Sequence, residues 1–553
     1  MPSGLRKTTG NHFEIYYEQP WGGVASDKDP VDINDNQLQV QQGVVAIDGA
    51  LCYTNMIADP TRFLFVQGSA NAYLAIIFEY TGLLFGLDQF GGLYAYDNVA
   101  GKFNQSTVAS DGPWVTASPP TAVQIVNGIA YIANFGRNSI YQYDGTAYTL
   151  ESNYTGGLVF GVLDDYLLQL NTNSATDGVQ SNRINWSGPG EFTTWDPSVN
   201  RTAGFNTLAA VEDQLTGFFS YASVGVAVSR KALIELSPTG VAIGPFTFTT
   251  LWTSTVGQGG VYPGSCTQYG QRGLLVTDSG VYSVSTGAGF TDISGSARTA
   301  ILSSFQLSEL VNSIQIPSVG ANLLLYYFNS SYPTPFYIVC GTVFQFGELN
   351  QTLQVWLMDL NTGIWSNLSY NVDTLVNSQN GTTFTNCLVS SLKVYTFDFP
   401  APDQASSAQQ FVNPLTLILI NVTVNGTNQT VTLYPAVFNK SVTNDANNMA
   451  GNLNLAFKAQ ELKLGFTRKS TTRRLVVKAY GTGTLVCAII DIDGTVTSLG
   501  DIVLDGTLNA KTYYSPLGIA TVEAPQLSIT STNFKGVIVK AMLAGTYADG
   551  EID

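Results

Sequence analysis

Residues 122–150 read AVQIVNGIAYIANFGRNSIYQYDGTAYTL, and this stretch decides the fold class. Two β-rich runs flank Asn127-Gly128, a strong two-residue hairpin signal because both turn positions need positive φ. A third run follows, and Asp144-Gly145 turns the chain into a fourth. Four short antiparallel strands in about thirty residues are typical of one blade of a β-propeller.

Similar units recur along the chain, each with a strand, an Asp or Asn, a Gly turn and an aromatic residue that opens the next strand. The stretch 183–197, RINWSGPGEFTTWDP, is one such unit. Equivalent positions at intervals of 47, 43, 48, 48 and 74 residues are Tyr96, Tyr143, Trp186, Ile234, Tyr282 and Trp356. Propeller repeats run about 40–50 residues per blade. The sequence therefore predicts an all-β fold with an irregular β-propeller core of about six blades.

The last interval is long because it contains an insertion. Within it, apolar residues at roughly helical spacing predict one short helix over 296–312, and they are Ala300, Ile301, Leu302, Phe305, Leu307, Leu310 and Val311. Beyond about residue 375 the rhythm changes to longer β-rich runs. Short strands separated by turn signals then indicate a second β domain of the sandwich type.

These boundaries divide the chain into four parts. We expect an N-terminal arm at 1–45 and a β-propeller-like domain at 46–375. A β-hairpin-rich insertion or linker region follows at 376–454, and a C-terminal β-sandwich domain occupies 455–553. Two strands are predicted early in the last part, at 474–478 and 484–490, and another at 462–466.

The composition favours polar, uncharged surfaces. Of 553 residues, 44% are hydrophobic and only 12% are charged, about half the usual share. The net charge is −16, and the 24 Lys and Arg are spread out, whereas a DNA-binding surface needs them clustered. The one basic run, Arg468-Lys469-Ser-Thr-Thr-Arg473-Arg474, is interpreted as a solvated loop or a strand entry.

Cysteine usage argues against a disulfide framework or a zinc site. The number is odd and no CxxC occurs, so we expect buried free thiols at Cys52, Cys266, Cys340, Cys387 and Cys487. The N-terminus has no apolar signal core, and no run of about twenty apolar residues predicts a membrane span.

Catalytic chemistry has few candidates. The single histidine, His12, lies in a segment without core-like periodicity and is expected to be a bystander. A glycosidase needs two facing carboxylates about 5–9.5 Å apart. The candidate pairs are Asp164-Asp165, Glu212-Asp213 and Asp491-Ile-Asp493, and all three fit turn chemistry better.

Two further segments could hold ligands in principle. The acidic stretch from Asp27 to Asp35 could bind calcium, although a solvated acidic arm is the favoured interpretation. The Gly-rich piece Gly257-Gln-Gly259-Gly260 lacks the Gly-Lys-Ser/Thr and the helix of a phosphate loop. We therefore assign no catalytic, cofactor-binding or metal-binding residue and expect no cofactor and no enzyme activity.

Several pieces, taken in order, resemble one protein family, the tail nozzle (tail hub, packaged-DNA stabilisation) proteins of short-tailed phages. The opening pieces are Pro20-Trp-Gly-Gly23, Asp29-Pro30, Ile33 and Asp35-Asn36-Gln37. The middle pieces are Arg183-Ile-Asn-Trp186-Ser187, Gly190, Trp195, Ala232-Leu-Ile-Glu235, Gly257, Gly259-Gly260-Val261, Leu274-Leu275, Gly280-Val-Tyr282 and the helix near Ala300. The closing pieces are Arg473-Arg-Leu-Val476 and Gly481-Thr-Gly483. The resemblance does not cover residues 385–450.

The resemblance implies a structural protein of the virion tail. Such nozzles form a ring or tube of identical chains, a hexamer, below the portal and the tail adaptor. They retain packaged double-stranded DNA without specific binding, contact a needle or plug protein, carry tailspikes or fibres and conduct DNA during ejection. The family implies no catalytic residue and no membrane anchor.

Two other functions stay open at this stage. One is a propeller enzyme that acts on polysaccharide through paired carboxylates. The other is a carbohydrate-binding propeller that uses Tyr and Trp rings as stacking platforms.

Overall fold

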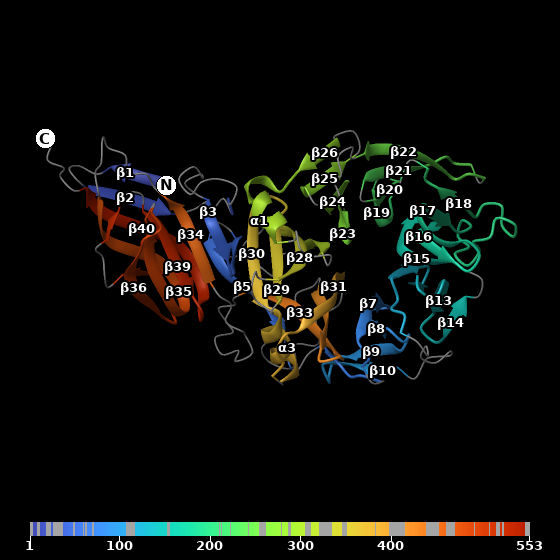
Figure 1. Cartoon of the computed structure of the whole chain (residues 1–553), viewed down its shortest axis with the longest axis horizontal. Helices are drawn as coiled ribbons and strands as arrows, with labels where there is room; N and C mark the ends of the chain where they lie inside the picture. The colour runs from blue at the N-terminus through green and yellow to red at the C-terminus, as the bar shows by residue number, and fades with distance from the viewer. Residues whose placement is uncertain are drawn as a thin grey trace.

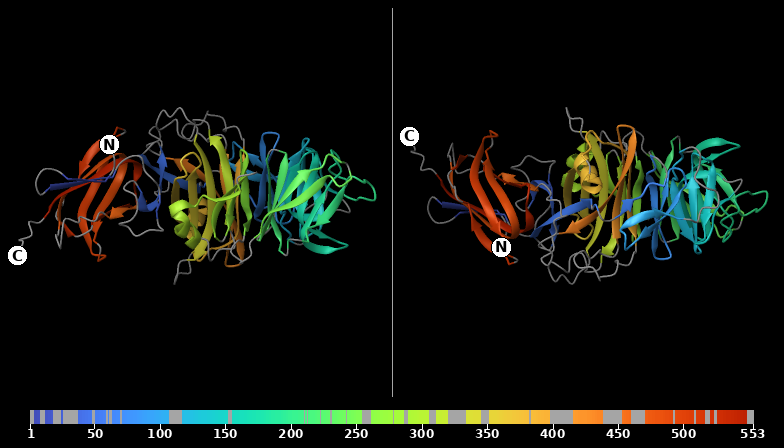
Figure 2. Two further views of the ribbon diagram at one scale, coloured as in Figure 1. Left: turned by 90° about the horizontal axis from the view of Figure 1, so that it is seen from above. Right: turned by 90° about the horizontal axis from the view of Figure 1, so that it is seen from below.

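The chain folds into a β-rich body of curled sheets with a β-sandwich at one end (Figure 1; Figure 2). The structure is a computed structural model that describes the whole chain except residues 1–3, 8–11, 18–23, 26–36, 48–49, 59, 61–62, 69–70, 107–116, 152–154, 210, 212, 222, 230, 242, 254–260, 278, 286–288, 305–310, 320–333, 345–350, 382, 398–414, 438–452, 460–469, 492, 508, 516–519, 523–524 and 548–553. The predicted all-β class is confirmed.

Five antiparallel sheets of four successive strands follow one another in chain order. The first holds β7 (Leu74–Tyr80), β8 (Leu83–Asp88), β9 (Leu93–Asp97) and β10 (Lys102–Gln105), with β6 (Leu64–Phe65) parallel to β10. The second holds β11 (Ala122–Val126), β12 (Ile129–Asn134), β13 (Ser139–Tyr143) and β14 (Tyr148–Glu151). The third holds β15 (Gly156–Leu163), β16 (Tyr166–Ser174), β17 (Gly178–Trp186) and β18 (Gly204–Thr207). The fourth holds β19 (Leu215–Tyr221), β20 (Val224–Ser229), β21 (Ala232–Pro238) and β22 (Phe246–Thr253). The fifth holds β23 (Val261–Tyr269), β24 (Arg272–Thr277), β25 (Gly280–Ser285) and β26 (Gly289–Asp292).

Two further groups of strands complete this propeller-like body. The sixth unit is β27 (Val311–Val319), β28 (Thr334–Phe344), β29 (Gln351–Asp359) and β30 (Trp365–Asn371). The seventh is β31 (Leu388–Phe397), β32 (Leu415–Val424) and β33 (Thr427–Val437), joined by β5 (Ala50–Ala58). The first strands of successive units contact one another, and β31 contacts both β27 and β7 (Figure 1).

The repeat positions predicted from the sequence fall on equivalent strands of the structure. All six equivalent positions, from Tyr96 to Trp356, lie on the third strand of their units. The repeat did not predict the seventh unit, whose hairpin falls in the region expected to be an insertion or linker. That unit is completed by β5, more than 300 residues earlier in the chain, and no local signal encodes such a pairing.

The helix prediction is only partly correct. A 3-10 turn, η1 (Gly295–Ala297), leads into α1 (Arg298–Ser303), but Val311 and Asn312 belong to strand β27, and 305–310 lie outside the described residues. A second helix, α3 (Val372–Asn380), was not predicted. The Asn371 side chain caps its start by accepting a hydrogen bond from the Thr374 N–H, and Gly381 ends it in the left-handed conformation.

The C-terminal sandwich consists of two sheets that share one long strand. Its strands are β34 (Leu453–Ala459), β35 (Ser470–Ile490), β36 (Val496–Asp505), β37 (Lys511–Tyr514), β38 (Ala520–Val522), β39 (Gln526–Ser531) and β40 (Lys535–Tyr547). The first half of β35 pairs with β40, β37 and β38, and its second half pairs with β36 and β39. The two strands predicted at 474–478 and 484–490 are therefore one strand, while 462–466 lies outside the described residues.

Strands from the described part of residues 1–45, which was expected to form an N-terminal arm, pair with strands of this sandwich, whereas Val24 packs with Leu274 and Trp356 in the propeller-like body. The strands are β1 (Gly4–Lys7), β2 (His12–Tyr17), β3 (Leu38–Gln42) and β4 (Val44–Ile47). β2 pairs with β40, β3 with β34, and β4 with β5. Ile15 and Tyr17 are buried in the same apolar cluster as Leu475, Leu485 and Leu527.

The sandwich and the propeller-like body are joined through a common core. Strand β5 pairs with β40 at Leu51 and Cys52 and with β33 from Thr54 onward. Tyr480 and Val537 of the sandwich pack in one apolar cluster with Leu353 of the sixth unit and Leu433 of the seventh. Burial of these side chains holds the two parts together.

Candidate functional site

The exposed carboxylates of the propeller-like body lie mainly in its turns. The Asp97 carboxylate accepts hydrogen bonds from the N–H groups of Val99 and Ala100, at 2.9 and 3.0 Å. Asp144 accepts bonds in the same way from Thr146 and Ala147. These backbone bonds hold the pKa of both carboxyl groups below the usual value, the bonds from Ala100 and Ala147 contributing most. Such carboxylates are ionised turn formers.

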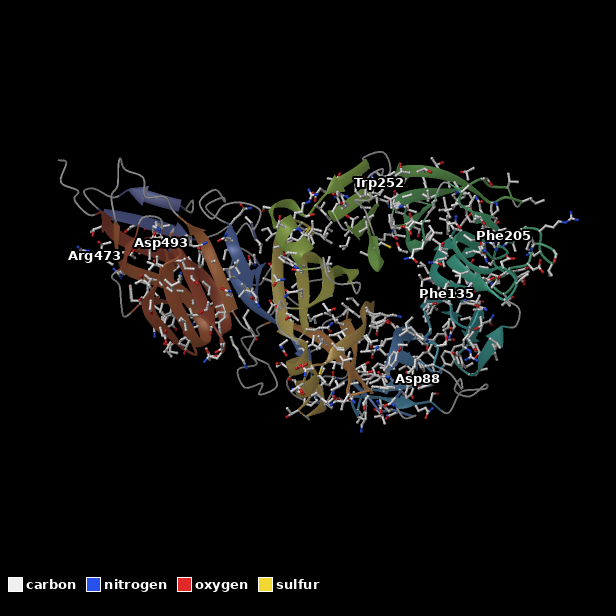
Figure 3. The ribbon with its side chains drawn as sticks, viewed as in Figure 1. Asp88, Phe135, Phe205, Trp252, Arg473 and Asp493 are labelled. Atoms are coloured by element: carbon white, nitrogen blue, oxygen red, sulfur yellow. The ribbon has the colours of Figure 1, made fainter. Side chains whose placement is uncertain are left out.

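The structure also places the predicted carboxylate pairs in turns. Asp164 and Asp165 are exposed between β15 and β16, and Asp164 has φ 54°. Asp493 accepts a hydrogen bond from the Thr495 N–H at 2.8 Å in the turn between β35 and β36, at the other end of the molecule (Figure 3). Asp213 bonds the adjacent Gln214 N–H. The Asp164-Asp165 pair and the Asp491–Asp493 pair therefore lie in different parts of the molecule and do not form one site.

Several predicted positions fall outside the described residues. They are Glu212, the Asp27–Asp35 stretch, the Gly257–Gly260 piece, Arg468 and Lys469, and the opening motif Pro20–Gly23. The backbone of His12 pairs with that of Thr546 in the sandwich, at the start of β2.

One carboxylate, Asp88 at the end of β8, is buried (Figure 3). Its Oδ1 accepts hydrogen bonds from the N–H groups of Phe90 and Gly92, and its Oδ2 accepts one from Tyr94 Oη at 2.9 Å. Tyr94 Oη in turn accepts a bond from the Gly68 N–H at 3.1 Å. Desolvation raises the pKa of Asp88, and desolvation with the nearby charge raises the pKa of Tyr94.

Asp88 belongs to a recurring turn arrangement that was not predicted from the sequence. Buried Asn134, Ser229 and Thr277 end the second strands of three other units, as Asp88 ends that of the first. In each, a side-chain oxygen accepts a backbone N–H two to four residues further on. The common role is to satisfy the turn between the second and third strands, so Asp88 is a structural acceptor.

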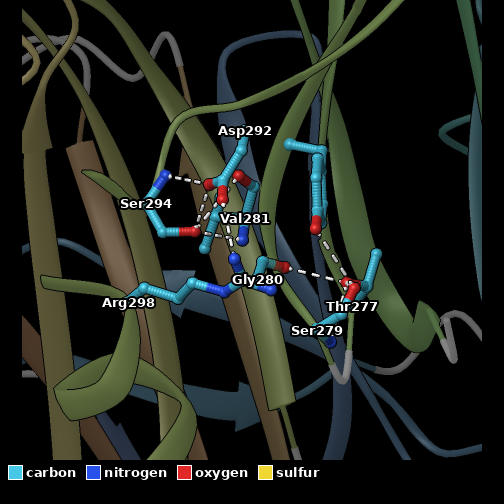
Figure 4. Close-up of polar contacts among 8 residues, drawn as sticks. Thr277, Ser279, Gly280, Val281, Asp292, Ser294 and Arg298 are labelled. Carbon is cyan, nitrogen blue, oxygen red and sulfur yellow. Dashed lines mark hydrogen bonds and ion pairs between the residues drawn. The ribbon is translucent and has the colours of Figure 1, made fainter. Parts of the chain in front are cut away.

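A second polar cluster fastens the helix to the fifth unit (Figure 4). The Ser294 hydroxyl donates to Asp292 at 2.6 Å and accepts a bond from the Val281 N–H at 2.8 Å. Arg298 of α1 forms an ion pair with the same carboxylate at 3.4 Å. The cluster fixes the start of the helix against β25 and leaves Asp292 engaged at both oxygens.

The aromatic rings are mostly engaged with one another. Phe290 stacks on both Trp252 and Tyr282, with centroid distances of 4.9 and 4.1 Å, and so joins the outer strands of the fourth and fifth units. Phe205, on outer strand β18, is 53% exposed, and the Arg183 guanidinium lies 4.4 Å from its ring centre (Figure 3). The Trp252–Phe290–Tyr282 stack is therefore a packing contact between strands and does not offer an open ring face to a sugar.

The five cysteines are free thiols, as predicted, and four of them are buried. Desolvation raises the pKa of Cys266, Cys387 and Cys487 to about 12, which leaves these thiols protonated at neutral pH. Within the described ranges, no group of three or more His, Cys, Asp or Glu is placed to hold a metal ion. No helix in that part of the chain is long and apolar enough to cross a bilayer.

Comparison with known proteins finds distant structural matches. No family model matches the chain, and no curated protein matches it. An exported protein of Bacteroides fragilis aligns over 69% of this chain and 95% of its own, with 10% identity and a TM-score of 0.32. The computationally designed protein Ika8 aligns over 68% of this chain and 99% of its own, with 10% identity and a TM-score of 0.33. The extracellular domain of a one-component system of B. thetaiotaomicron covers 78% of this chain and 56% of its own, with 10% identity and a TM-score of 0.33.

Proposed function

We propose that this chain is a structural subunit of the tail nozzle of a short-tailed phage. It forms a ring or tube, a hexamer, below the portal and adaptor, retains packaged DNA, carries tailspikes or fibres and conducts DNA on infection. The ordered resemblance of sequence pieces carries the proposal. Its described pieces include residues of β17, β21, β24, β25, α1 and β35, so they belong to both parts of the molecule.

The chemistry of the side chains favours an assembly role over catalysis. The carboxylates that a glycosidase would need are engaged as turn acceptors or lie in separate domains. The surface instead exposes aliphatic side chains on loops and is poor in charge, which suits protein contacts.

Electron microscopy of particles that carry a tagged copy of this chain tests the proposal. We expect a ring of tag density around the tail axis, several copies per particle, below the portal. An untagged particle is the control. One isolated copy on the axis, or no copy on the particle, would contradict the proposal.

The solution mass of the purified protein gives an independent measurement. A nozzle subunit forms a ring under conditions that favour assembly, whereas a carbohydrate-active propeller of this size would more often be a monomer or dimer. Hydrolysis of a host polysaccharide that is lost on mutating Asp164 and Asp165 would favour the enzyme alternative.

A further inference from the structure

Charge is divided unequally between the two parts of the chain. Residues 46–375 contain 22 acidic and 9 basic residues, whereas residues 455–553 contain 9 acidic and 10 basic residues. Most of the net charge of −16 therefore belongs to the propeller-like body. The sandwich is close to neutral overall, but several of its basic residues lie together on one outer surface of a sheet.

One face of the propeller-like body gathers exposed carboxylates. In an antiparallel meander, the turns after the first and third strands lie on the same face. Two hydrogen bonds between such turns agree with this: Tyr80 Oη donates to the Gly128 carbonyl at 2.6 Å, and the Gly190 N–H donates to the Asp165 carbonyl at 2.8 Å. The acidic residues on or next to these turns are the exposed Asp144, Asp164, Asp165, Glu191 and Asp196 and the half-buried Asp97 and Asp359, and the basic ones are Lys102, Arg201 and Arg272. We call this the loop face.

Aliphatic side chains project from the same loops. Val99 is 99% exposed, Val199 is 78% exposed and Ile243 is 68% exposed, each on the loop between a third and a fourth strand. The loop with Ile243 is braced, because the Thr239 hydroxyl donates to the Gly244 carbonyl at 2.9 Å. The loop face therefore combines carboxylates with exposed apolar side chains, the composition of a protein-docking surface.

The sandwich presents a surface of the opposite sign, which we call the sheet face. On β35, Arg474 and Lys478 alternate with the buried residues Leu475 and Val477, so both cationic side chains lie on the outer side of the sheet. Lys540 of β40 is the register partner of Lys478. A surface of this sign is complementary to an acidic one.

The sheet face also has an apolar part. Tyr514 of β37 is 54% exposed, and the Arg474 guanidinium lies 4.3 Å from its ring centre. Arg473, exposed beside it, lies at the outer end of the sandwich, away from the propeller-like body (Figure 3). The loop face of the same chain is thus on a different part of the molecule.

We propose that the sheet face of one copy of this chain docks on the loop face of a second copy. Different surfaces then meet at each contact, and such a heterologous contact closes into a ring when its rotation allows. The inference rests on the proposed function only in identifying the ring as the product. Arg474, from the basic run that was predicted to be a solvated loop or a strand entry, lies on β35 and thereby becomes part of an interface.

Charge reversal tests the contact in the full-length protein. The loop-face variant is Asp165→Lys with Glu191→Lys, and the sheet-face variant is Lys478→Glu with Lys540→Glu. Lys231→Glu, on an exposed turn of the opposite face of the body, is the matched control. Thermal unfolding of every variant is compared with wild type to establish that each one folds.

Self-association is then measured by sedimentation velocity at about 0.1 M salt, where charges interact over about 10 Å, and at about 1 M salt, where the range falls to about 3 Å. We expect wild type to associate at low salt and to dissociate at high salt. Each double reversal weakens association by about tenfold or more, while the control has little effect. Combining all four substitutions in one chain restores association, because the signs are complementary again.

Three results would overturn the inference. They are wild type that stays monomeric at low salt, reversals without effect, and a four-substitution chain that associates no better than its parents. Binding of duplex DNA that the sheet-face variant alone loses would instead assign that face to a polyanion. Particles that keep an intact ring with either reversal would refute this interface but leave the nozzle proposal standing, whereas absence of the chain from the tail axis would refute the nozzle proposal itself.

Discussion

Gly481 of β35 and Gly536 of β40 are register partners that approach too closely for any side chain between them. A Cβ on Gly481 would lie 2.5 Å from the Gly536 Cα, and a Cβ on Gly536 would lie 3.1 Å from the Gly481 Cα. Gly481 also has φ 117°, which L-residues with side chains rarely adopt. This is the point at which β35 passes from one sheet of the sandwich to the other.

Gly481→Ala should strongly destabilise the sandwich. The new methyl group meets the Lys535 carbonyl and the Gly536 backbone, and the φ angle adds strain, so we expect a loss of about 3 kcal/mol or more. Urea unfolding measures it. Thr482→Ala, at the exposed neighbouring position, is the control and should change stability little. Equal stability of the two variants would contradict the close approach.

Asp88→Ala should cost about 3 kcal/mol, because the N–H groups of Phe90 and Gly92 would be left buried without an acceptor. Asp88→Asn keeps one oxygen acceptor and should lose less. The pKa of Asp88 is raised on folding, so its contribution favours the folded state below the unfolded pKa of about 3.9 and is lost as pH rises through the folded value. Chemical unfolding of wild type and the Asn variant across pH 3–7 measures this contribution to the free energy of unfolding. Identical pH profiles of the two proteins would refute a raised pKa at Asp88.

Lys393→Met should stabilise the protein at neutral pH. Lys393 lies on the side of β31 that also carries Tyr395 and faces the apolar cluster around Leu419, and burial lowers its pKa to about 8. Below that pH, both folded and unfolded chains bind the proton, and the folded state bears the full cost of burying the charge. Between about pH 8 and 10.4 the unfolded chain binds more protons, so wild-type stability rises with pH and the advantage of Met shrinks. Thermal unfolding at pH 7 and pH 9.5 measures the stability difference between the Met variant and wild type. A difference that grows with pH would contradict the prediction.

The assembled protein should show no appreciable binding of duplex DNA at low salt. A conduit with basic walls would gain counterion-release free energy at each neutralised phosphate and slow the passage of DNA. In the proposed nozzle, the excess of 40 acidic over 24 basic residues favours an acidic, polar lumen. Fluorescence anisotropy with a labelled duplex measures binding. Tight binding that weakens steeply with salt, or a channel wall lined by Lys and Arg, would show the prediction to be wrong.

Positions with strong local chemistry were predictable from the sequence. Asn127 and Gly128 have φ of 51° and 76°, as the hairpin signal required, and the aromatic equivalents Tyr143 and Trp186 lie on third strands. The turn carboxylates could also be predicted, because Asp accepts bonds from its own next residues. By contrast, α3 was missed although Asn371 and Gly381 mark its ends and its apolar residues recur at helical spacing, because the helix is only nine residues long and mostly polar.

The sequence by itself determined the strands, their turns and the repeat, because steric limits on φ and hydrogen bonds within a few residues act locally. Only the tertiary structure decided which distant strands pair. It placed β5 beside β33, built residues 12–17 into the sandwich and carried β35 through two sheets. It likewise put Lys478 beside Lys540 and Asp165 beside Gly190. Such pairings depend on the apolar area buried by whole sheets across hundreds of residues, and no short window of sequence contains that free energy.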